Sequence, residues 1–167
     1  MNKLKIVIAY DGSHFRGWQI QPGEKTVQDS LELAIKKITH AKIKVHGSGR
    51  TDTGVHALGQ VAHFEIPLDS RMTAQEWQRA INVNLPPTIR VLSAELVPTD
   101  FHARFSAKSK TYRYDINTSQ ILSPHEFLKV WHHPKNLDVS MLKRACDLYV
   151  DTYDFASFAV NRGDGKE

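Results

Sequence analysis

Residues 47–57 read Gly-Ser-Gly-Arg-Thr-Asp-Thr-Gly-Val-His-Ala, the most informative stretch of this chain. Three glycines in eleven residues predict a loop whose tight backbone path is closed to other residue types. Arg50 and Asp52 lie two positions apart, where a sharp bend exposes both side chains. A guanidinium beside a carboxylate keeps that carboxylate ionised at neutral pH. Asp52 is therefore the leading candidate for a catalytic nucleophile or base.

The sequence before this loop predicts a strand, a helix and a second strand. Apolar residues alternate with other residues from Leu4 to Tyr10, which is typical of a strand. Asp11-Gly12-Ser13 predicts a turn after it. Apolar residues at helical spacing predict a helix over 27–39. A second strand, over 42–46, would then enter the glycine-rich loop.

The sequence after the loop predicts a strand, a helix and another strand. Alternation predicts the strand over 60–66. The residues Thr73-Ala74-Gln75-Glu76 have the form of a capping box, which would open a helix that ends near residue 83. A fourth strand is predicted over 89–96. The order β-α-β-β-α-β is the split unit of ferredoxin-like and RNA-recognition folds, so we expect an α+β fold with an antiparallel sheet and helices on one face.

A second, similar unit begins near residue 106. Its sequence predicts a strand over 110–117, a helix capped by Ser140, and a further strand over 155–160. These elements make up only half of a split unit, which leaves an open sheet edge. We therefore expect two domains, one over 1–105 and an incomplete one over 106–167.

The positive charge of the chain is concentrated in one segment. Of the 167 residues, 22 are Lys or Arg and 18 are Asp or Glu, for a formal net charge of +4. Between residues 102 and 114 there are four cations and no acid. Aromatic residues lie among these cations, a mixture that suits RNA phosphates with exposed bases. The same pattern fits a solvated strand with its rings in the core. The cations are Arg104, Lys108, Lys110 and Arg113, and the aromatic residues are Phe105, Tyr112 and Tyr114.

Several kinds of site are disfavoured by the sequence. The glycine-rich loop lacks the Gly-Lys-Ser/Thr ending of a nucleotide-binding loop. Ser48, Asp52 and His56 lack the Gly-x-Ser-x-Gly elbow of many hydrolases. The nine histidines form no tight metal pattern. The single cysteine, Cys146, excludes an intrachain disulfide. No apolar run is long enough to span a membrane, so we expect a cytoplasmic protein that binds neither membrane nor metal.

The chain resembles the tRNA pseudouridine synthase A family in several separate motifs. The loop at 47–57 carries that family's Gly-x-Gly-Arg-Thr-Asp-x-Gly-Val-His-Ala pattern complete. The match covers about residues 4–116 and is looser from 137 to 158. Its further motifs are Tyr10-Asp11-Gly12, Phe15-x-Gly17-Trp18-Gln19, Thr26-Val27-Gln28, Gln60-Val61-Ala62-His63-Phe64, Asn84-Leu85-Pro86, Phe101-His102-Ala103-Arg104-Phe105-Ser106-Ala107 and Lys110-Thr111-Tyr112-Arg113-Tyr114.

The resemblance implies an isomerase that converts uridine to pseudouridine in the anticodon stem-loop of tRNA, at tRNA positions 38–40. It also implies a homodimer that uses neither metal nor organic cofactor. On this resemblance Asp52 is the essential aspartate, Arg50 contacts it and helps to extrude the target nucleotide, and Tyr112 stacks on the target base. Family members continue past the end of this chain and supply the floor of the uracil pocket there. We therefore expect either a C-terminally truncated fragment, which the incomplete second unit favours, or a reduced relative that completes itself by association. The residues expected to bind RNA also include His56, Arg104, Lys108, Lys110 and Arg113.

Alternatives to this interpretation stay open at the level of sequence. A non-catalytic RNA-binding module would use the same architecture, although the chain lacks the signature of RNA-recognition modules. A dimerisation fragment without any role in RNA binding is a further possibility. Asp52 alone could be a turn residue that bonds to its own backbone. As a catalyst, its carboxylate could attack C1′ of the sugar or C6 of the base, or take a sugar proton.

Overall fold

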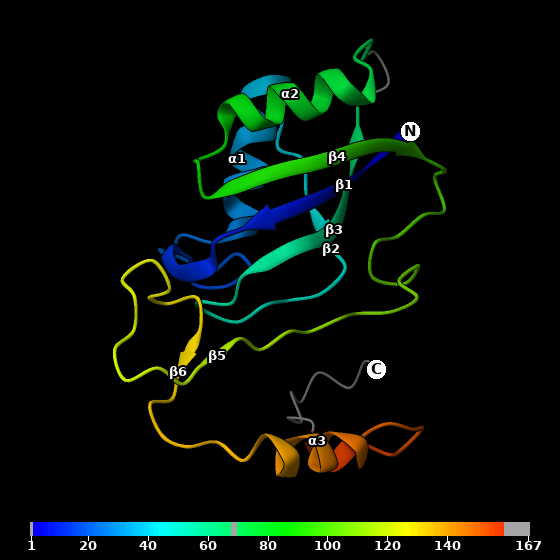
Figure 1. Cartoon of the computed structure of the whole chain (residues 1–167). Helices are drawn as coiled ribbons and strands as arrows, with labels where there is room; N and C mark the ends of the chain where they lie inside the picture. The colour runs from blue at the N-terminus through cyan, green and yellow to red at the C-terminus, as the bar shows by residue number, and fades with distance from the viewer. Residues whose placement is uncertain (1, 68–69, 159–167) are drawn as a thin grey trace.

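The first part of the chain is a four-stranded antiparallel sheet with two helices (Figure 1). The structure is a computed structural model that describes residues 2–67 and 70–158. The strand order β2-β3-β1-β4 places β3 and β1 at the centre. The predicted β-α-β-β-α-β order is therefore confirmed. In chain order the elements are β1 (Asn2–Tyr10), the 3-10 turn η1 (Gly12–His14), α1 (Val27–Thr39), β2 (His46–Gly47), β3 (Ala57–Ile66), α2 (Ala74–Asn84) and β4 (Ile89–Val97).

The core lies between the two helices and one face of this sheet. Ile6 of β1 is opposite Ala62 of β3 and Ala94 of β4, so alternate residues of all three strands face the helices. Phe64 of β3 packs edge-on against Trp77 of α2, with ring centroids 5.7 Å apart. Figure 1 shows α1 and α2 together on this side of the sheet, as predicted. The fully buried core residues include Leu4, Ile6, Ile8, Leu31, Ile35, Phe64, Trp77 and Ile81.

Both helices begin at side-chain caps. Thr26 precedes α1, and its hydroxyl accepts a hydrogen bond from the amide of Asp29. Thr73 and Glu76 form the predicted capping box of α2, in which each side chain accepts from the other residue's backbone amide. These caps satisfy amides that have no partner inside the helix.

The strand predicted over 42–46 is wrong for all but its last residue, because β2 contains only His46 and Gly47. The backbone of Val45 is bound by side chains of α1 rather than by a neighbouring strand. Its amide donates to Oε1 of Glu32 at 3.0 Å, and its carbonyl accepts from Nε2 of Gln28 at 2.9 Å. The apolar pattern of this segment reflects burial of Val45 against the helix.

The second part of the chain contains few regular elements. They are β5 (Ile116–Asn117), β6 (Trp131–His132), α3 (Val139–Asp147) and the 3-10 turn η2 (Ala156–Phe158). The strand predicted over 110–117 is wrong for all but its last two residues, which pair in parallel with β6. The strand predicted over 155–160 is also wrong, because residues 156–158 form η2. Residues 159–160 lie outside the described residues.

Helix α3 stands apart from the sheet core and buries none of its side chains. Its N-cap is Asp138, not the predicted Ser140, since the Asp138 carboxylate accepts from the amide of Met141 at 2.9 Å. Tyr149 and Phe155, just beyond it, stack with ring centroids 6.3 Å apart, yet both remain exposed. In the part of the chain that the structure describes, no helix has the length and apolar character needed to cross a membrane.

Candidate functional site

The loop that carries Asp52 is anchored to the loop that follows β1. The amide of Trp18 donates to the carbonyl of Thr51 at 2.9 Å, and the amide of Gly54 donates to the carbonyl of Phe15 at 3.4 Å. The hydroxyl of Tyr10, at the end of β1, lies 2.8 Å from that of Thr51. These contacts fix the backbone on both sides of Asp52.

Two glycines allow these loops to approach so closely. Gly17 has a φ of +80°, and a Cβ atom built on it would lie 2.6 Å from the carbonyl oxygen of Thr51. A Cβ atom on Gly47 would lie 2.6 Å from the indole ring of Trp18. Any side chain at either position would push the two loops apart.

A second layer of contacts supports the same loop from β3. The amide group of Gln60 donates to the carbonyl of Gly49 at 3.0 Å and to the Tyr10 hydroxyl at 3.4 Å. Burial raises the pKa of Tyr10, while its hydrogen bond to Thr51 opposes this effect. The Tyr10 hydroxyl therefore stays protonated and links β1, β3 and the Asp52 loop.

Asp52 lies at a hollow of about 350 Å³ between the two loops. Its carboxylate is exposed, and so is the guanidinium of Arg50 beside it. Arg16 also lines the hollow, from the loop after η1. The remaining lining residues are Gln19, Gln21, Thr51 and Thr53.

Arg50 and Asp52 share this hollow but form no ion pair. Among the residues with described positions, no lysine, arginine or histidine nitrogen lies within 4.0 Å of the Asp52 carboxylate. The contact expected between them is therefore absent from this structure. Both groups are free to bind a substrate.

His56 contacts protein groups through both ring nitrogens. Its Nδ1 accepts from the amide of Gly12 at 3.3 Å and lies 3.2 Å from Oδ1 of Asp11. Its Nε2 lies 2.8 Å from the carbonyl oxygen of Leu128, 72 positions along the chain. Because a carbonyl oxygen only accepts, Nε2 is the donor in the contact with Leu128. The predicted RNA contact of His56 would have to replace one of these partners.

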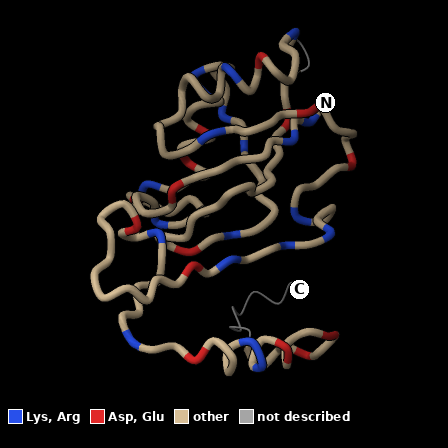
Figure 2. The backbone as a smooth tube through the Cα atoms, in the orientation of Figure 1, with Lys and Arg blue, Asp and Glu red and all other residues tan. Residues whose placement is uncertain are grey.

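The predicted cations lie along the extended chain between β4 and β5 (Figure 2). Lys110 approaches the site most closely, because its Nζ lies 3.0 Å from the position of a Cβ on Gly49. Arg104 and Lys108 are exposed, and Arg104 lies over the ring of Phe105 at 5.8 Å. Arg113 pairs with Asp115 at 3.0 Å. This segment therefore brings positive charge next to the Asp52 loop.

Tyr112 is 70% exposed and does not line the Asp52 hollow. It lies two residues after Lys110, which does reach the loop. Tyr114 is 85% exposed, so neither ring lies in the core. Tyr112 is free to pack on a ligand, but the structure does not bring it to Asp52.

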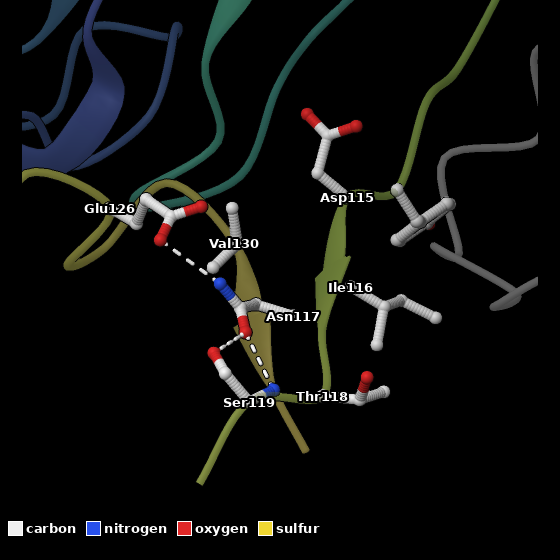
Figure 3. A pocket seen from close by; sticks show the side chains of 8 residues that line it. Asp115, Ile116, Asn117, Thr118, Ser119, Glu126 and Val130 are labelled. Carbon is white, nitrogen blue, oxygen red and sulfur yellow. Dashed lines mark hydrogen bonds between the residues drawn. The ribbon is translucent and has the colours of Figure 1, made fainter. Parts of the chain in front are cut away.

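A larger hollow of about 750 Å³ lies around β5 and β6 (Figure 3). Figure 3 shows Asn117 between Glu126 and Ser119, to both of which it is hydrogen-bonded. The polar groups of this hollow are thus largely bound to one another. Its lining includes Tyr114 but none of the predicted catalytic or RNA-binding residues, so the hollow at Asp52 is the better candidate site despite its smaller size.

The sequence comparisons agree with the motif at the Asp52 loop. Residues 6–106 match the sequence profile described as tRNA pseudouridine synthase. The chain belongs to the tRNA pseudouridine synthase family. It is 48% identical over 163 residues to tRNA pseudouridine synthase A of Akkermansia muciniphila, covering 98% of this chain and 62% of that protein. The enzymes of the same name from Maridesulfovibrio salexigens and Listeria innocua are 46% and 43% identical, over 95% and 97% of this chain and 58% and 65% of theirs. The chain thus spans about three fifths of the length of these curated relatives.

The sequence-based prediction missed part of the candidate site at Asp52. It identified the Asp52 loop, but it gave Phe15-x-Gly17-Trp18-Gln19 only as a family motif and did not place it beside Asp52. Gly17 and Trp18 gave a signal, because a glycine next to a large aromatic residue in a loop often marks a close backbone contact. Arg16 gave no signal of its own, since only the fold brings it to the Asp52 hollow.

Proposed function

We propose that this chain isomerises uridine to pseudouridine in the anticodon stem-loop of tRNA, with Asp52 as the essential carboxylate. One observation carries the proposal: within the family's matched region, the exposed carboxylate of Asp52 shares a hollow with Arg50 and Arg16. The names of the relatives support tRNA as the substrate.

The proposed reaction requires a carboxylate next to an everted nucleotide. The N1–C1′ bond of uridine breaks, a C5–C1′ bond forms, the proton on C5 is released to solvent, and N1 takes up a proton. A base inside a stem is out of reach, so it must first leave the helix. Asp52 would then act on C1′, on C6 or on a sugar proton. Its loop is hydrogen-bonded on both sides, which would keep the carboxylate in place during the rotation of the uracil.

Arg50 and Tyr112 have supporting roles in the proposal. Arg50 would stabilise the extruded nucleotide through its two-pronged donor group, which suits a phosphate or a carboxylate. Tyr112 would stack on the target base, an interaction worth about 1–3 kcal/mol per base. Because Tyr112 is exposed and outside the hollow, this role requires its segment to move towards Asp52 when RNA binds.

Tritium release from tRNA labelled at C5 of uridine tests the proposal. The unmodified chain should release tritium, and Asp52→Asn should release none while binding the stem-loop with nearly unchanged affinity. Asp147→Asn, an exposed aspartate on α3, is the matched control and should behave like the unmodified chain. Equal RNA binding by all three proteins without any release would instead identify a non-catalytic RNA-binding module.

The proposal includes a partner and a compartment. A tRNA substrate places the chain in the cytoplasm, and the family resemblance adds a second copy of the chain. Exposed apolar side chains on and after α3, among them Met141, Leu148 and Tyr149, support self-association. Light scattering of the purified chain should give twice the mass of one chain, and a single-chain mass at micromolar concentration would contradict this.

A further inference from the structure

Arg16 is a cation of the Asp52 hollow with an incompletely used donor group. Its only protein partner among the described side chains is Glu24, whose Oε2 lies 3.4 Å from Arg16 Nε. The two side chains are 62% and 45% exposed, and exposed ion pairs of this kind contribute little. Another anion could therefore replace Glu24 as the partner of Arg16 with little loss of folding free energy.

The position of Arg16 is fixed by the residues on either side of it. The carbonyl of Phe15 and the amide of Trp18 bond to the Asp52 loop, and Gly17 is in close contact with Thr51. The amide of Arg16 itself donates to the carbonyl of Lys25 at 2.9 Å. The backbone therefore holds Arg16 at the hollow, while the guanidinium beyond it remains free to turn.

The neighbouring polar side chains are already engaged. Gln19 donates through Nε2 to Gln28 at 2.9 Å, and Gln21 donates to the carbonyl of Arg16 at 3.0 Å. On this wall of the hollow, Arg16 is thus the side chain with donors to spare for a ligand. Its planar fork matches the geometry of a phosphate.

We infer that Arg16 binds a backbone phosphate next to the everted target nucleotide. This inference rests on the proposed function and extends it. A nucleotide flips by rotation about its backbone, so its two flanking phosphates remain at the mouth of the hollow while the base enters. Arg50 comes from the loop that carries Asp52, and Arg16 comes from the opposite loop. Together they place a cation on each side of an incoming nucleotide.

Glu24 competes with that phosphate for Arg16. Arg16→Gln should weaken binding of a synthetic anticodon stem-loop about five- to tenfold and lower the slope of log K against log salt by about 1. Glu24→Gln should have the opposite effect and tighten binding, since it releases the guanidinium and removes a negative charge. Arg79→Gln, an exposed arginine on α2, is the matched control and should change neither value. A loss of folding could not produce changes in both directions.

A neutral methylphosphonate at the phosphate on either side of the target uridine gives the decisive test. If Arg16 binds that phosphate, the substitution at one of the two positions weakens binding by the unmodified chain but has little further effect on Arg16→Gln. Additive losses at both positions would overturn the assignment, and so would the absence of stem-loop binding. Coupling in a chain that releases no tritium would contradict the proposed catalysis while supporting the phosphate contact.

Discussion

Asp52 illustrates how a candidate catalytic side chain can be left free on a backbone that is hydrogen-bonded on both sides. Its neighbour Thr51 is bound through both its carbonyl and its hydroxyl, to Trp18 and Tyr10. The Asp52 carboxylate itself has no protein hydrogen bond among the described residues and faces solvent. A group of this kind reacts with little rearrangement of the protein.

Gly17→Ala should therefore damage the site more than an ordinary glycine substitution would. Its positive φ costs about 1 kcal/mol for any other residue, and the new Cβ atom would also collide with the Thr51 carbonyl. We expect a total loss of about 3 kcal/mol in the free energy of unfolding, measured by urea titration with tryptophan fluorescence.

Gly23→Ala is the control that separates these two effects. Gly23 has a φ of +76°, but a Cβ atom placed on it would have no neighbouring atom within 4 Å, so only the backbone cost of about 1 kcal/mol applies. Equal losses for the two variants would show that the close contact between the loops contributes nothing to stability.

At the scale of elements, the sequence predicted helices and central strands well. The helix over 27–39 has the predicted bounds, because its apolar spacing and its threonine cap agree. The capping box placed the start of α2 correctly. β3 begins three residues earlier than predicted, at Ala57. Local sequence signals were sufficient to predict an element wherever its apolar residues pack on the core of the sheet unit.

The errors arose where a strand-like pattern has no adjacent strand. Val45 bonds to side chains of α1 instead, and most of 110–117 has no strand beside it in the described structure. The alternation of aromatic residues there left two interpretations open, RNA contact or burial in the core, and the structure shows Tyr112 and Tyr114 exposed. Non-local pairing decides these cases, and one sequence does not reveal the partner.

The low pKa of His63, a histidine of β3, predicts that the protein loses stability in acid. His63 is buried against His102, with ring centroids 4.7 Å apart, and its Nδ1 accepts from the amide of Ala103. Burial, aided by the nearby charges of His102, His46 and Lys3, lowers the pKa of His63 from 6.5 to about 4. The unfolded chain therefore takes up this proton first as the pH falls.

Stability should fall between about pH 6.5 and pH 4 by up to about 3 kcal/mol on account of His63. His63→Gln should flatten this part of the pH profile, as followed by urea unfolding at several pH values. His14→Gln, an exposed histidine in η1, should leave the profile unchanged. A profile equally steep in His63→Gln would assign the effect to other groups.

At the scale of the whole molecule, the candidate site lies where the two parts of the chain meet. The Asp52 loop belongs to the sheet unit, whereas Lys110 and Leu128 reach it from the second part. The division into domains at residue 105 stays a prediction. The first part supplies all the residues that line the Asp52 hollow, and the second part adds a cation, Lys110, beside Gly49 of the same loop.

The salt dependence of RNA binding tests the contribution of the second part. The double variant Lys108→Gln/Lys110→Gln should reduce the slope of log K against log salt by about 1 for each lysine that meets a phosphate. Lys36→Gln/Lys37→Gln, on the exposed side of α1, is the matched control. An unchanged slope in the first variant would show that these lysines face away from the RNA.

The imidazole of His56 connects the turn after β1 with the backbone at Leu128, 72 positions after His56 in the chain. One nitrogen meets the turn after β1, and the other meets the backbone at Leu128. Cleavage of the backbone near Leu128 would thus remove a contact that holds the Asp52 loop through His56. Damage to a distant surface segment would thus affect the proposed catalytic carboxylate without changing any residue that lines its hollow.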